Sequence, residues 1–548
     1  MSLKLPQAPN SGLFKQGYQT YQSEDGAVNR NIAAVREITS MVRTSIGPCG
    51  RNKIVVNHLS KIFLTSDAAT ILRELEIVHP AAKLVVMASQ QQETEQGDAS
   101  NLVLILAGEL LHQAEGLLRL GLSTSEIAQG FDLACQFALK TLDEQVVGEI
   151  SDLSDPAQLN KAVRSAVASK QYGNEDVLSK LICEAVTHVL PKNPRYFNID
   201  NVRVVKIMGS SLEASTVIKG MVFNHEPEGE IKKTTSRSKV AIYTCPVDIS
   251  STETKGTVLL HNAKEILDFS KGEEAQLESQ IKEISDAGVK VVIAGAGIGE
   301  LALHYLTRQG LLVFKIGSKF DLRRLCRVVG ATPLARFGAP MPEEMGVIDV
   351  VETVEIGGDR VTVFRQKDEQ TRTSTIVLRG ATQNALEDLE RAVDDGVNSI
   401  KALTKDARLV AGAGATEISL ASKIVSYGEK TPGLLQHAIK KFGESFEVIP
   451  QTLAENAGLD PTEIVSRLYS ANAKNSHAGV DVDDNEGTGT LNAVEHGIFD
   501  VLSAKKSAIQ LATEAATTVL SVDQIIMAKR AGGPQIPKQQ PGNWDQDD

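Results

Sequence analysis

The chain has 548 residues, of which 42% are hydrophobic, and it carries a formal net charge of −12. Because this length exceeds the size at which one hydrophobic core keeps growing, we expect two to four domains. The acidic balance argues against nucleic acid as the main partner, since a nucleic-acid backbone usually requires a basic protein face.

The N-terminal residues do not have the pattern of an export signal. Met1–Pro6 contains no apolar core, and no uninterrupted apolar run in the chain reaches the length that crosses a membrane. The five cysteines are scattered, without a C-x-x-C pair or a histidine at zinc-ligand spacing, so we expect reduced, unliganded thiols. These features predict a cytoplasmic protein with no membrane partner.

The first predicted element is a helix over about residues 24–45. Five apolar residues recur there at spacings of three and four, as on one face of a helix: Val28, Ile32, Val35, Ile38 and Val42. Gly47 and Pro48 must end this helix, so the glycine turn of residues 46–50 follows a rigid support.

A second, strongly apolar helix is predicted to start just after Asp98. Residues 98–101 then lie at its N-terminal end, where free N–H groups and the positive end of the helix dipole stabilise an anion. An aspartate or serine that simply caps the helix explains the same residues, and the sequence does not separate the two interpretations.

The middle of the chain changes character. Residues 289–293, 295–299, 300–308 and 311–316 are typical of a strand, a glycine turn, a helix and a strand, which predicts a parallel βαβ unit. The preceding segment, 262–287, is rich in Glu, Lys and Gln with sparse apolar positions, so we expect a helix that is not deeply buried. Apolar alternation over 374–378 predicts a strand.

The C-terminal region is predicted to be helical over residues 505–527, because its apolar residues keep a helical period. After Lys529 the pattern stops. The glycines and prolines that follow, together with the acidic end at 544–548, predict a disordered tail.

Some segments of the sequence match known ligand-binding motifs only in part. Gly295–Gly299 resembles a dinucleotide-binding turn, but Glu300 stands where the third glycine belongs and would bring a negative charge near a pyrophosphate. Gly428–Thr431 lacks the upstream glycine of a Walker A loop. We interpret His79, which precedes a proline, as a helix-boundary residue, and Tyr172 as a packing residue.

Four segments at opposite ends of the chain contain the glycines and carboxylates that suit a phosphate site: 44–50, 97–101, 394–396 and 412–417. Glycine lets backbone N–H groups approach a phosphate, hydroxyl and amide groups add donors, and aspartate holds Mg²⁺ or orients water. One site built from all four would require the two ends to fold together, which makes the middle of the chain an insertion.

In their order along the chain and in their residues, the four segments resemble the nucleotide site of group II chaperonins. This family includes the eukaryotic cytosolic ring complex TRiC/CCT. The resemblance runs nearly end to end and includes residues 72–76, 79–83, 169–174, 390–396 and 522–529. Within the family, Gln171–Asn174, Asp394–Gly396 and the tail from Ala531 are similar to one particular type of subunit.

The resemblance implies an α/β multidomain chaperonin subunit. A mostly helical equatorial ATP-binding domain would take residues 1–150 and 405–530, and a small α/β intermediate domain would take 151–217 and 370–404. An α/β apical substrate-binding domain would take 218–369, with a helical protrusion that acts as a lid at about 248–279. Residues 531–548 would form the disordered tail.

The resemblance also implies a site for ATP or ADP with Mg²⁺, in which Asp98 coordinates the metal. The implied nucleotide contacts are Ile46, Gly47, Asp98, Ala99, Ser100, Asn101, Ser169, Lys170, Gly412, Asp500 and Lys505. For hydrolysis, Asp395 matches the residue that orients and deprotonates the attacking water, and Asp67 matches a second carboxylate beside the γ-phosphate. Taken alone, Asp394 and Asp395 would be an exposed acidic pair on a helix.

The implied function is that of an ATP-hydrolysing chaperone subunit. Its partners would be paralogous subunits in an eight-membered double ring and non-native cytosolic clients such as actin and tubulin. The chain departs from the family pattern at Ala68 and Ala99, where most members have glycine. Each added methyl restricts positive φ close to the phosphates, so a ring subunit that binds nucleotide, hydrolyses it poorly and serves chiefly as scaffold is the alternative.

Overall fold

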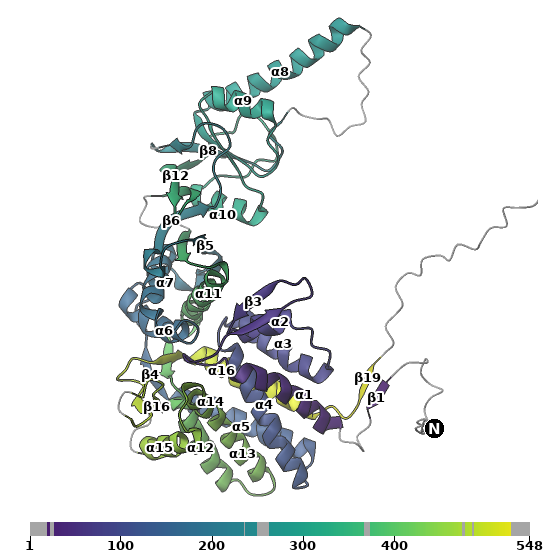
Figure 1. Ribbon diagram of the computed structural model, residues 1–548, viewed down its shortest axis with the longest axis vertical. Helices are drawn as coiled ribbons and strands as arrows, with labels where there is room; N and C mark the ends of the chain where they lie inside the picture. Colours follow the sequence, from purple (N-terminus) through teal and green to yellow (C-terminus); the bar gives the residue numbers. More distant parts are fainter. Residues whose placement is uncertain are drawn as a thin grey trace, which may run out of the picture.

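The computed structural model describes residues 19–21, 27–234, 236–248, 262–366, 373–473, 477–484 and 487–527. Figure 1 shows three layers along the longest axis, with both ends of the described chain in the helical lower layer. The chain runs from the lower layer through the middle layer to the upper layer and then returns by the same route.

The lower layer is mainly helical. Its helices are α1 (Ala27–Arg43), α2 (Ala68–Glu74), α3 (Pro80–Glu95), α4 (Ser100–Arg119), α5 (Thr124–Glu144), α12 (Ala415–Lys430), α13 (Leu435–Glu444), α14 (Val448–Ala457), α15 (Pro461–Asn472) and α16 (Leu502–Leu520), with the 3₁₀ turn η5 (Ser445–Glu447). One core cluster contains residues of both chain ends, from Ile32 in α1 to Leu520 in α16. The two ends therefore fold together, as predicted.

The two helices predicted at the N-terminal end are confirmed. In α1, four of the five stripe residues are buried and Val28 packs at the edge of the core. Helix α4 begins at Ser100 and buries most of its apolar side chains. His79 stands directly before α3 and makes no side-chain capping bond, which confirms it as a helix-boundary residue.

Short strands complete the lower layer. They are the hairpin β2 (Lys53–Val56) and β3 (Ile62–Thr65), the sheet β18 (Phe499–Val501), β15 (Arg408–Ala411) and β4 (Val146–Glu149), the pair β16 (Ala478–Val480) and β17 (Thr490–Asn492), and the pair β1 (Gln19–Tyr21) and β19 (Ile525–Met527). Strands β4 and β15 pair where the chain leaves the lower layer and where it re-enters it.

The prediction of one helix over residues 505–527 is wrong at its C-terminal end. Helix α16 ends at Leu520, and Ile525–Met527 form β19, which pairs antiparallel with β1. The β-branched Ile525 and Ile526 suit a strand, and the partner strand comes from the opposite end of the chain, where a local helical period gives no sign of it. The expected tail at 531–548 lies outside the described residues.

The middle layer combines helices with a sheet. Its helices are α6 (Pro156–Ala168), α7 (Glu175–Val189) and α11 (Gln383–Lys405), with the 3₁₀ turns η2 (Pro194–Tyr196), η3 (Ile199–Asn201) and η4 (Leu212–Ala214). A six-stranded sheet continues into the upper layer in the order β5 (Val202–Met208), β14 (Ser374–Gly380), β6 (Thr216–Phe223), β13 (Asp359–Arg365), β12 (Val350–Ile356) and β7 (Lys233–Thr234). The strand predicted at 374–378 is confirmed as part of β14, which pairs parallel with β5.

The upper layer is built on a four-stranded sheet. Its strands follow the order β10 (Leu312–Lys315), β9 (Val289–Ala294), β8 (Ser238–Tyr243) and β11 (Gly346–Ile348), and its helices are α8 (Ala263–Asp286), α9 (Glu300–Arg308) and α10 (Lys319–Val329). Strand β10 pairs parallel with β9, so the predicted βαβ unit is confirmed. A side chain at Gly299 would collide with the Asp248 carboxylate, so this glycine turn serves a close approach within the protein.

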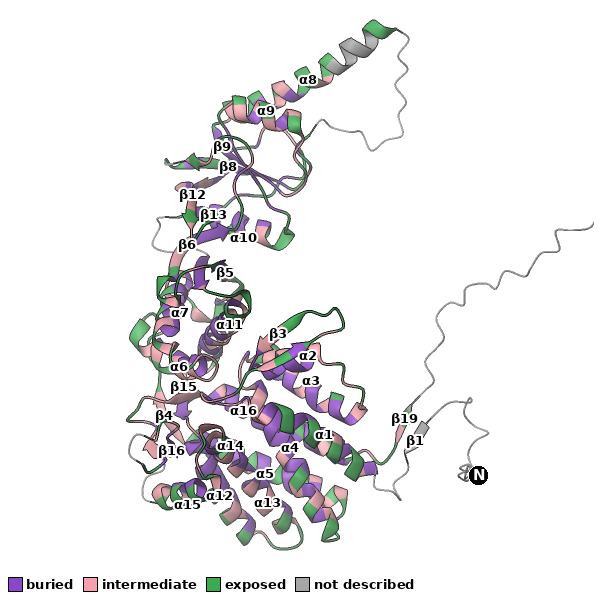
Figure 2. Ribbon diagram, in the orientation of Figure 1, coloured by how far each residue is buried: buried purple, intermediate pink, exposed green. Residues whose placement is uncertain are grey.

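Helix α8 confirms the prediction of a sparsely buried helix at 262–287. Leu277, Ile281 and Ile284 attach its C-terminal half to the sheet. Figure 2 shows the helix extending beyond the upper layer, with many exposed positions. The part of the expected lid at 249–261 lies outside the described residues. In the part of the chain that the structure describes, no helix combines the length and apolar character needed to cross a bilayer.

Candidate functional site

A cavity of about 720 Å³ is lined by parts of α4, α6, α12 and α16 together with the loops that join them. Residues from both ends of the chain meet there, including Gly47, Asp98 and Asp500. The loop after α6 contributes Ser169 and Lys170 from the middle layer. The cavity therefore lies where the lower and middle layers face each other.

The N-terminal end of α4 forms one wall of the cavity. Gly97 and Ala99 both have positive φ, 74° and 64°, and this places Ala99 at the N-cap without a side-chain capping bond. The interpretation of Asp98 or Ser100 as an ordinary N-cap is therefore wrong. A side chain at Gly97 would collide with Asn398 of α11, which explains the glycine. The first N–H groups of α4 have no carbonyl one turn earlier, so they are available to an anion.

The Asp98 carboxylate lines the cavity without a basic partner. Its Oδ1 accepts a hydrogen bond of 2.6 Å from the Ala99 backbone N–H. Among the described residues, no lysine or arginine forms an ion pair with Asp98. Burial raises the pKa of Asp98, although the Ala99 N–H and the more distant Lys170 oppose the shift. A carboxylate in this setting is stabilised by a cation.

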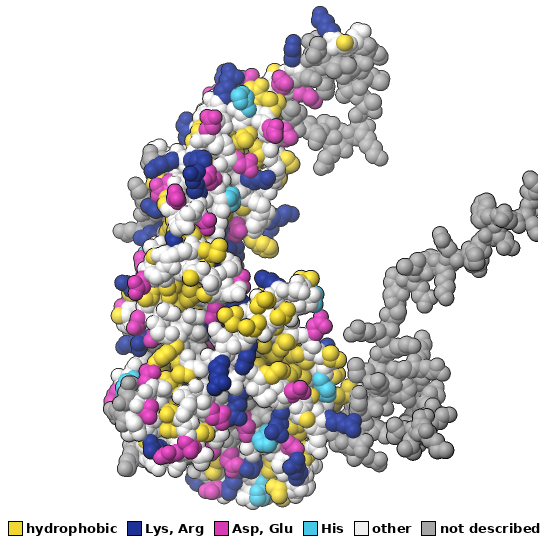
Figure 3. Space-filling model, in the orientation of Figure 1, with side chains coloured by type: hydrophobic (Ala, Val, Ile, Leu, Met, Phe, Trp, Pro, Cys, Tyr) yellow, Lys and Arg dark blue, Asp and Glu magenta, His cyan; other side chains and the backbone are white. Residues whose placement is uncertain are grey.

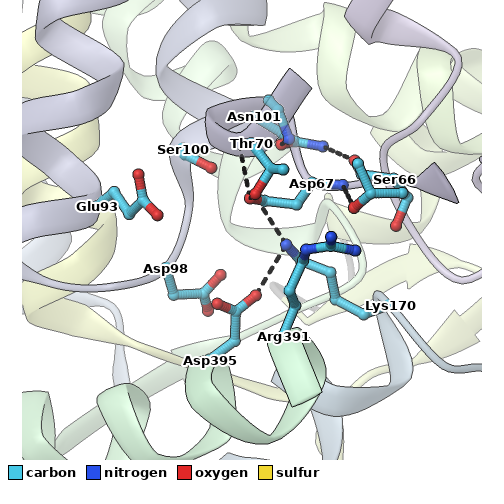
Figure 4. Close-up of polar contacts among 12 residues, drawn as sticks. Ser66, Asp67, Thr70, Glu93, Asp98, Ser100, Asn101, Lys170, Arg391 and Asp395 are labelled. Atoms are coloured by element: carbon cyan, nitrogen blue, oxygen red, sulfur yellow. Dashed lines mark hydrogen bonds and ion pairs between the residues drawn. The ribbon is translucent and has the colours of Figure 1, made fainter. Parts of the chain in front are cut away.

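Lys170 joins two other carboxylates beside this wall. Its Nζ lies 2.8 Å from Oδ1 of Asp67 and 2.8 Å from Oδ2 of Asp395, as the dashed lines in Figure 4 mark. Burial alone would lower the pKa of Lys170, but the carboxylates of Asp395 and Asp67 raise it well above its usual range. The ammonium group therefore keeps its proton and holds the loop after α6 against α11 and the start of α2.

Asp67 is the N-cap of α2 and is well supplied with donors. Its Oδ2 accepts hydrogen bonds from the Thr70 backbone N–H at 2.9 Å and from the Thr70 hydroxyl at 2.7 Å. Burial would raise the pKa of Asp67, but the Lys170 ammonium and these bonds hold it well below the usual range. Asp67 therefore stays ionised.

Asp395 lies in the middle of α11, and its side chain is 16% exposed. Burial, together with the carboxylates of Asp67 and Asp98, raises the pKa of Asp395, while Lys170 opposes the shift. Figure 4 shows the carboxylates of Asp395 and Asp98 lying close to each other beside Lys170. The interpretation of an exposed acidic pair holds for Asp394, which is exposed, and is wrong for Asp395.

Opposite α4, the turn at Ile46 and Gly47 is fixed by the second half of the chain. The Asn456 side-chain amide donates to the Ile46 carbonyl at 2.9 Å. Gly47 has a φ of 81°, and a side chain there would collide with Leu453. Both residues line the cavity.

Two of the implied nucleotide contacts, Asp500 and Lys505, form a charge cluster with Glu417. Lys505 Nζ lies 2.7 Å from Oε1 of Glu417 and 2.9 Å from Oδ2 of Asp500. Burial would lower the pKa of Lys505, but both carboxylates raise it well above its usual range. Lys505 thus has two carboxylate partners. Asp500, with a side chain 36% exposed, is the more accessible group.

Most of the predicted site residues come together around the cavity. The residues that line it are Ile46, Gly47, Asp98, Ala99, Ser100, Asn101, Ser169, Lys170, Asp500 and Lys505. Three others adjoin it: Asp67 and Asp395 bind Lys170, and Gly412 precedes the lining residue Ala413 and donates its N–H to Ile498.

Among the residues of the cavity wall that were not predicted as site residues are Tyr172 and Asp483. The prediction of Tyr172 as a packing residue is wrong, since its side chain is 43% exposed and its hydroxyl donates to Asp483. Glu417, the carboxylate of the predicted segment 412–417, lies in the first turn of α12 after Gly414 and lines the cavity. Asp483 gave no such signal, because its loop has no recognisable pattern.

The comparisons with known proteins agree with the resemblance to group II chaperonins. A sequence model of the TCP-1/cpn60 chaperonin family matches residues 38–530. Across the full length of both chains, the sequence is 60% identical to T-complex protein 1 subunit theta of Saccharomyces cerevisiae and 49% identical to that of Homo sapiens. It is 59% identical to a probable theta subunit of Schizosaccharomyces pombe. Theta is the subunit type to which Gln171–Asn174, Asp394–Gly396 and the tail are similar, so that prediction is confirmed.

Proposed function

Since the chain belongs to the TCP-1/cpn60 chaperonin family, whose members are ATP-driven folding machines, we propose that it is an ATP-hydrolysing subunit of a hetero-oligomeric chaperonin. The observation that carries this proposal is the cavity between the lower and middle layers. It combines a free helix N-terminus, the unpaired carboxylate of Asp98 and the cation of Lys170. This donor set suits a nucleoside triphosphate with its metal ion.

Asp98 is the residue that would hold Mg²⁺. Within the described residues, no three His, Cys, Asp or Glu side chains gather into a metal site of their own. Magnesium usually takes only one or two protein carboxylates and completes its shell with phosphate oxygens and water, so a single carboxylate beside a phosphate site fits it. Bound there, Mg²⁺ would neutralise charge on the phosphates.

The phosphates would bind the N-terminal turn of α4, through the N–H groups and side chains of Ala99, Ser100 and Asn101. The backbone at Ile46 and Gly47 would contact the nucleotide from the opposite wall, and Ser169 and Lys170 would reach it from the middle layer. At the other end, the turn that begins at Gly412 would contact the ribose and base. Lys505 would position Asp500 there rather than bind the nucleotide directly.

For hydrolysis, Asp395 would orient the attacking water and accept its proton. Its raised pKa brings it closer to neutral pH, where a general base is most efficient. Asp67, whose pKa is lowered, would stay ionised and hold Lys170 beside the phosphates. Lys170 now covers Oδ2 of Asp395, so the proposal requires its ammonium group to shift towards the γ-phosphate before water can take that position.

The three layers would correspond to three domains. The equatorial domain would comprise residues 1–150 and 405–530, the intermediate domain 151–217 and 370–404, and the apical domain 218–369. The pairing of β4 with β15 near two of these boundaries supports the division. Helix α8 would be the stem of the lid, because Leu277, Ile281 and Ile284 attach its C-terminal half to the sheet and the helix extends beyond the upper layer.

The partners would be paralogous subunits in a double ring of eight-membered rings, which encloses non-native cytoplasmic clients such as actin and tubulin. Several large apolar side chains on the β2–β3 hairpin are exposed, namely Ile54, Val56, Leu59 and Ile62. Figure 3 shows apolar atoms gathered over this region of the lower layer. An exposed apolar patch of this kind supports contact with a neighbouring subunit.

A second candidate function is a nucleotide-binding scaffold subunit with little hydrolysis. The observation that favours it lies at the two alanines that replace glycine. Ala99 is held at a φ of 64°, which costs an L-residue roughly 1 kcal/mol. The Ala68 N–H donates to Oδ1 of Asn101 at 3.0 Å, so this N–H already has a partner within the protein.

Purification of the native complex through a tag on this chain tests the proposal. We expect the mass of a double ring with several different chains, and labelling of this chain by a photoreactive azido-ATP in the presence of Mg²⁺. Asp98→Ala should weaken the labelling, whereas the matched variant Asp359→Ala, at an exposed position of the upper layer, should not. A free monomer, a ring of this chain alone, or equal labelling of both variants would contradict it.

A further inference from the structure

Three consecutive side chains in the loop between α6 and α7 bind different parts of the molecule. Lys170 binds Asp67 and Asp395, and the Gln171 amide donates to Oδ2 of Asp388 in α11 at 2.5 Å. The Tyr172 hydroxyl donates to Oδ2 of Asp483 at 2.5 Å. The proposed nucleotide chemistry uses Lys170 and gives no role to Tyr172.

The Tyr172–Asp483 hydrogen bond spans two layers at the rim of the cavity. Tyr172 belongs to the middle layer, and Asp483 belongs to the lower-layer loop that follows β16. Both residues line the cavity and both are exposed, so the pair lies at its opening to solvent. In Figure 1, α6 lies directly above the region of β4 and β16.

The surroundings of both Asp483 and Tyr172 favour this hydrogen bond. The Asp483 N–H donates to Oδ1 of Asp481 at 3.1 Å, and Oδ1 of the next residue, Asp484, accepts the Gly489 N–H at 2.7 Å, so hydrogen bonds support the backbone on both sides of Asp483. On the other side, the hydrogen bond to Asp483 raises the pKa of Tyr172 to about 12. The phenol therefore stays protonated and keeps donating at neutral pH.

A nucleotide in the cavity would be enclosed between the α6 side and the lower layer, since Ser165 and Ala166 line it from above and Gly414 and Asp500 line it from below. Its release requires these walls to separate at the rim. A hydrogen bond across that rim must break before the walls separate, so it adds to the barrier for release.

We propose that the Tyr172–Asp483 hydrogen bond is a latch that slows the exchange of the nucleoside phosphate in this subunit. The proposal rests on the proposed function, since it assumes that the cavity takes a nucleotide. A net hydrogen bond between a hydroxyl and a carboxylate at a solvent-exposed rim corresponds to a change of about three- to tenfold in the release rate.

The test uses the intact native complex, loaded with a photoreactive azido-ADP and then chased with excess unlabelled nucleotide. Irradiation at successive times, followed by separation of the chains, gives the release rate for this subunit alone, and the neighbouring chains serve as internal references. Tyr172→Phe removes only the hydroxyl. The matched control is Tyr196→Phe, because the Tyr196 side chain is 79% exposed and lies outside the cavity wall.

We expect Tyr172→Phe to speed loss of the label about three- to tenfold, with the same ring assembly and the same initial labelling. Asp483→Asn should do the same, and the double variant should be no faster than either single variant, since all three break one bond. Equal release from wild type and Tyr172→Phe, or fully additive effects, would overturn the latch while leaving the nucleotide site intact. No labelling of the wild-type chain would overturn the proposed function, and the latch with it.

Discussion

Lys170 Nζ lies 2.8 Å from Oδ2 of Asp395, and this ion pair ties the loop after α6 to the middle of α11. The same ammonium group binds Asp67, so one cation serves two buried carboxylates. A carboxylate that is covered by a cation is a weak base towards water. The resting arrangement therefore keeps Asp395 inactive, and a phosphate that attracts Lys170 would release it.

Removal of Lys170 should destabilise the contact between the two layers. In Lys170→Met, Asp67 and Asp395 lose their shared cation although both remain largely buried. Breaking a buried ion pair by removing one partner typically costs about 3–5 kcal/mol. We expect the variant chain to leave the purified complex at a lower urea concentration, as followed by native mass spectrometry.

The control for this prediction is Lys161→Met, which removes an exposed lysine from α6, the helix that precedes the Lys170 loop. It should dissociate at nearly the same urea concentration as the wild type, since exposed charges contribute little. If both variants dissociated at the same urea concentration, the ion pairs of Lys170 would contribute nothing to the stability of the contact between the layers.

Two glycines near α4 should respond in opposite ways to the same substitution. A side chain at Gly97, with a φ of 74°, would meet Asn398, so Gly97→Ala should destabilise the chain and weaken nucleotide labelling. Gly116, within α4, has no neighbouring atom within 4 Å of the added carbon, so Gly116→Ala should stabilise the helix by about 0.5–1 kcal/mol.

Hydrogen exchange of peptides from α4, measured in the intact complex, checks both signs at once. Faster exchange is expected for Gly97→Ala and slower exchange for Gly116→Ala. The same sign in both variants would mean that the backbone geometry at Gly97 is not what the structure describes.

The buried carboxylate of Asp395 predicts a dependence of local stability on pH. Its pKa in the folded chain is raised above the usual 3.8. A raised pKa means that the folded state binds the proton more tightly, so the resulting stabilisation is complete below the usual pKa and is lost as the pH rises through the folded pKa. Asp395→Asn does not ionise and should escape this loss.

We therefore expect Asp395→Asn to protect α11 against hydrogen exchange relative to the wild type, by a ratio that grows as the pH rises through the raised pKa of Asp395. Comparison at equal pH removes the intrinsic dependence of exchange on pH. The exposed-site variant Asp359→Asn should show a constant ratio. A ratio for Asp395→Asn that shrinks towards high pH would show that the pKa of Asp395 is lowered instead.

Local patterns predicted the elements whose stability is local. The apolar stripe of α1, the apolar helix α4 and the unit β9–α9–β10 were all visible in the sequence, because periodicity of two or of three to four reflects which side faces the core. Strand β19 was missed because its partner, β1, comes from the other end of the chain.

The site was predicted as a set of residues, without its charge pairing. The resemblance named Asp67, Lys170 and Asp395, but nothing in their spacing indicates that one ammonium group binds both carboxylates. Tyr172 was misinterpreted because an aromatic side chain is usually buried, and its partner lies in a loop more than three hundred residues away. Contacts of this kind depend on how the layers pack together, and a local sequence pattern does not predict that packing.

In the proposed mechanism, Asp395 acts on water while Asp98 holds the metal. The variant Asp395→Ala should therefore bind ATP and fail to hydrolyse it. A metal ligand contacts the ground state and the transition state alike, whereas a general base acts only as the water attacks. The matched control is Asp394→Ala, which removes the exposed neighbour on the same helix.

The most direct measurement is the ratio of γ-phosphate label to α-phosphate label that this chain retains after the complex is incubated with azido-ATP and irradiated. We expect the ratio to stay high in Asp395→Ala, because ATP remains intact, and to fall in the wild type and in Asp394→Ala, where ADP accumulates. A low ratio in Asp395→Ala would contradict the role of Asp395. A high ratio in the wild type as well would contradict hydrolysis by this subunit and favour the scaffold function.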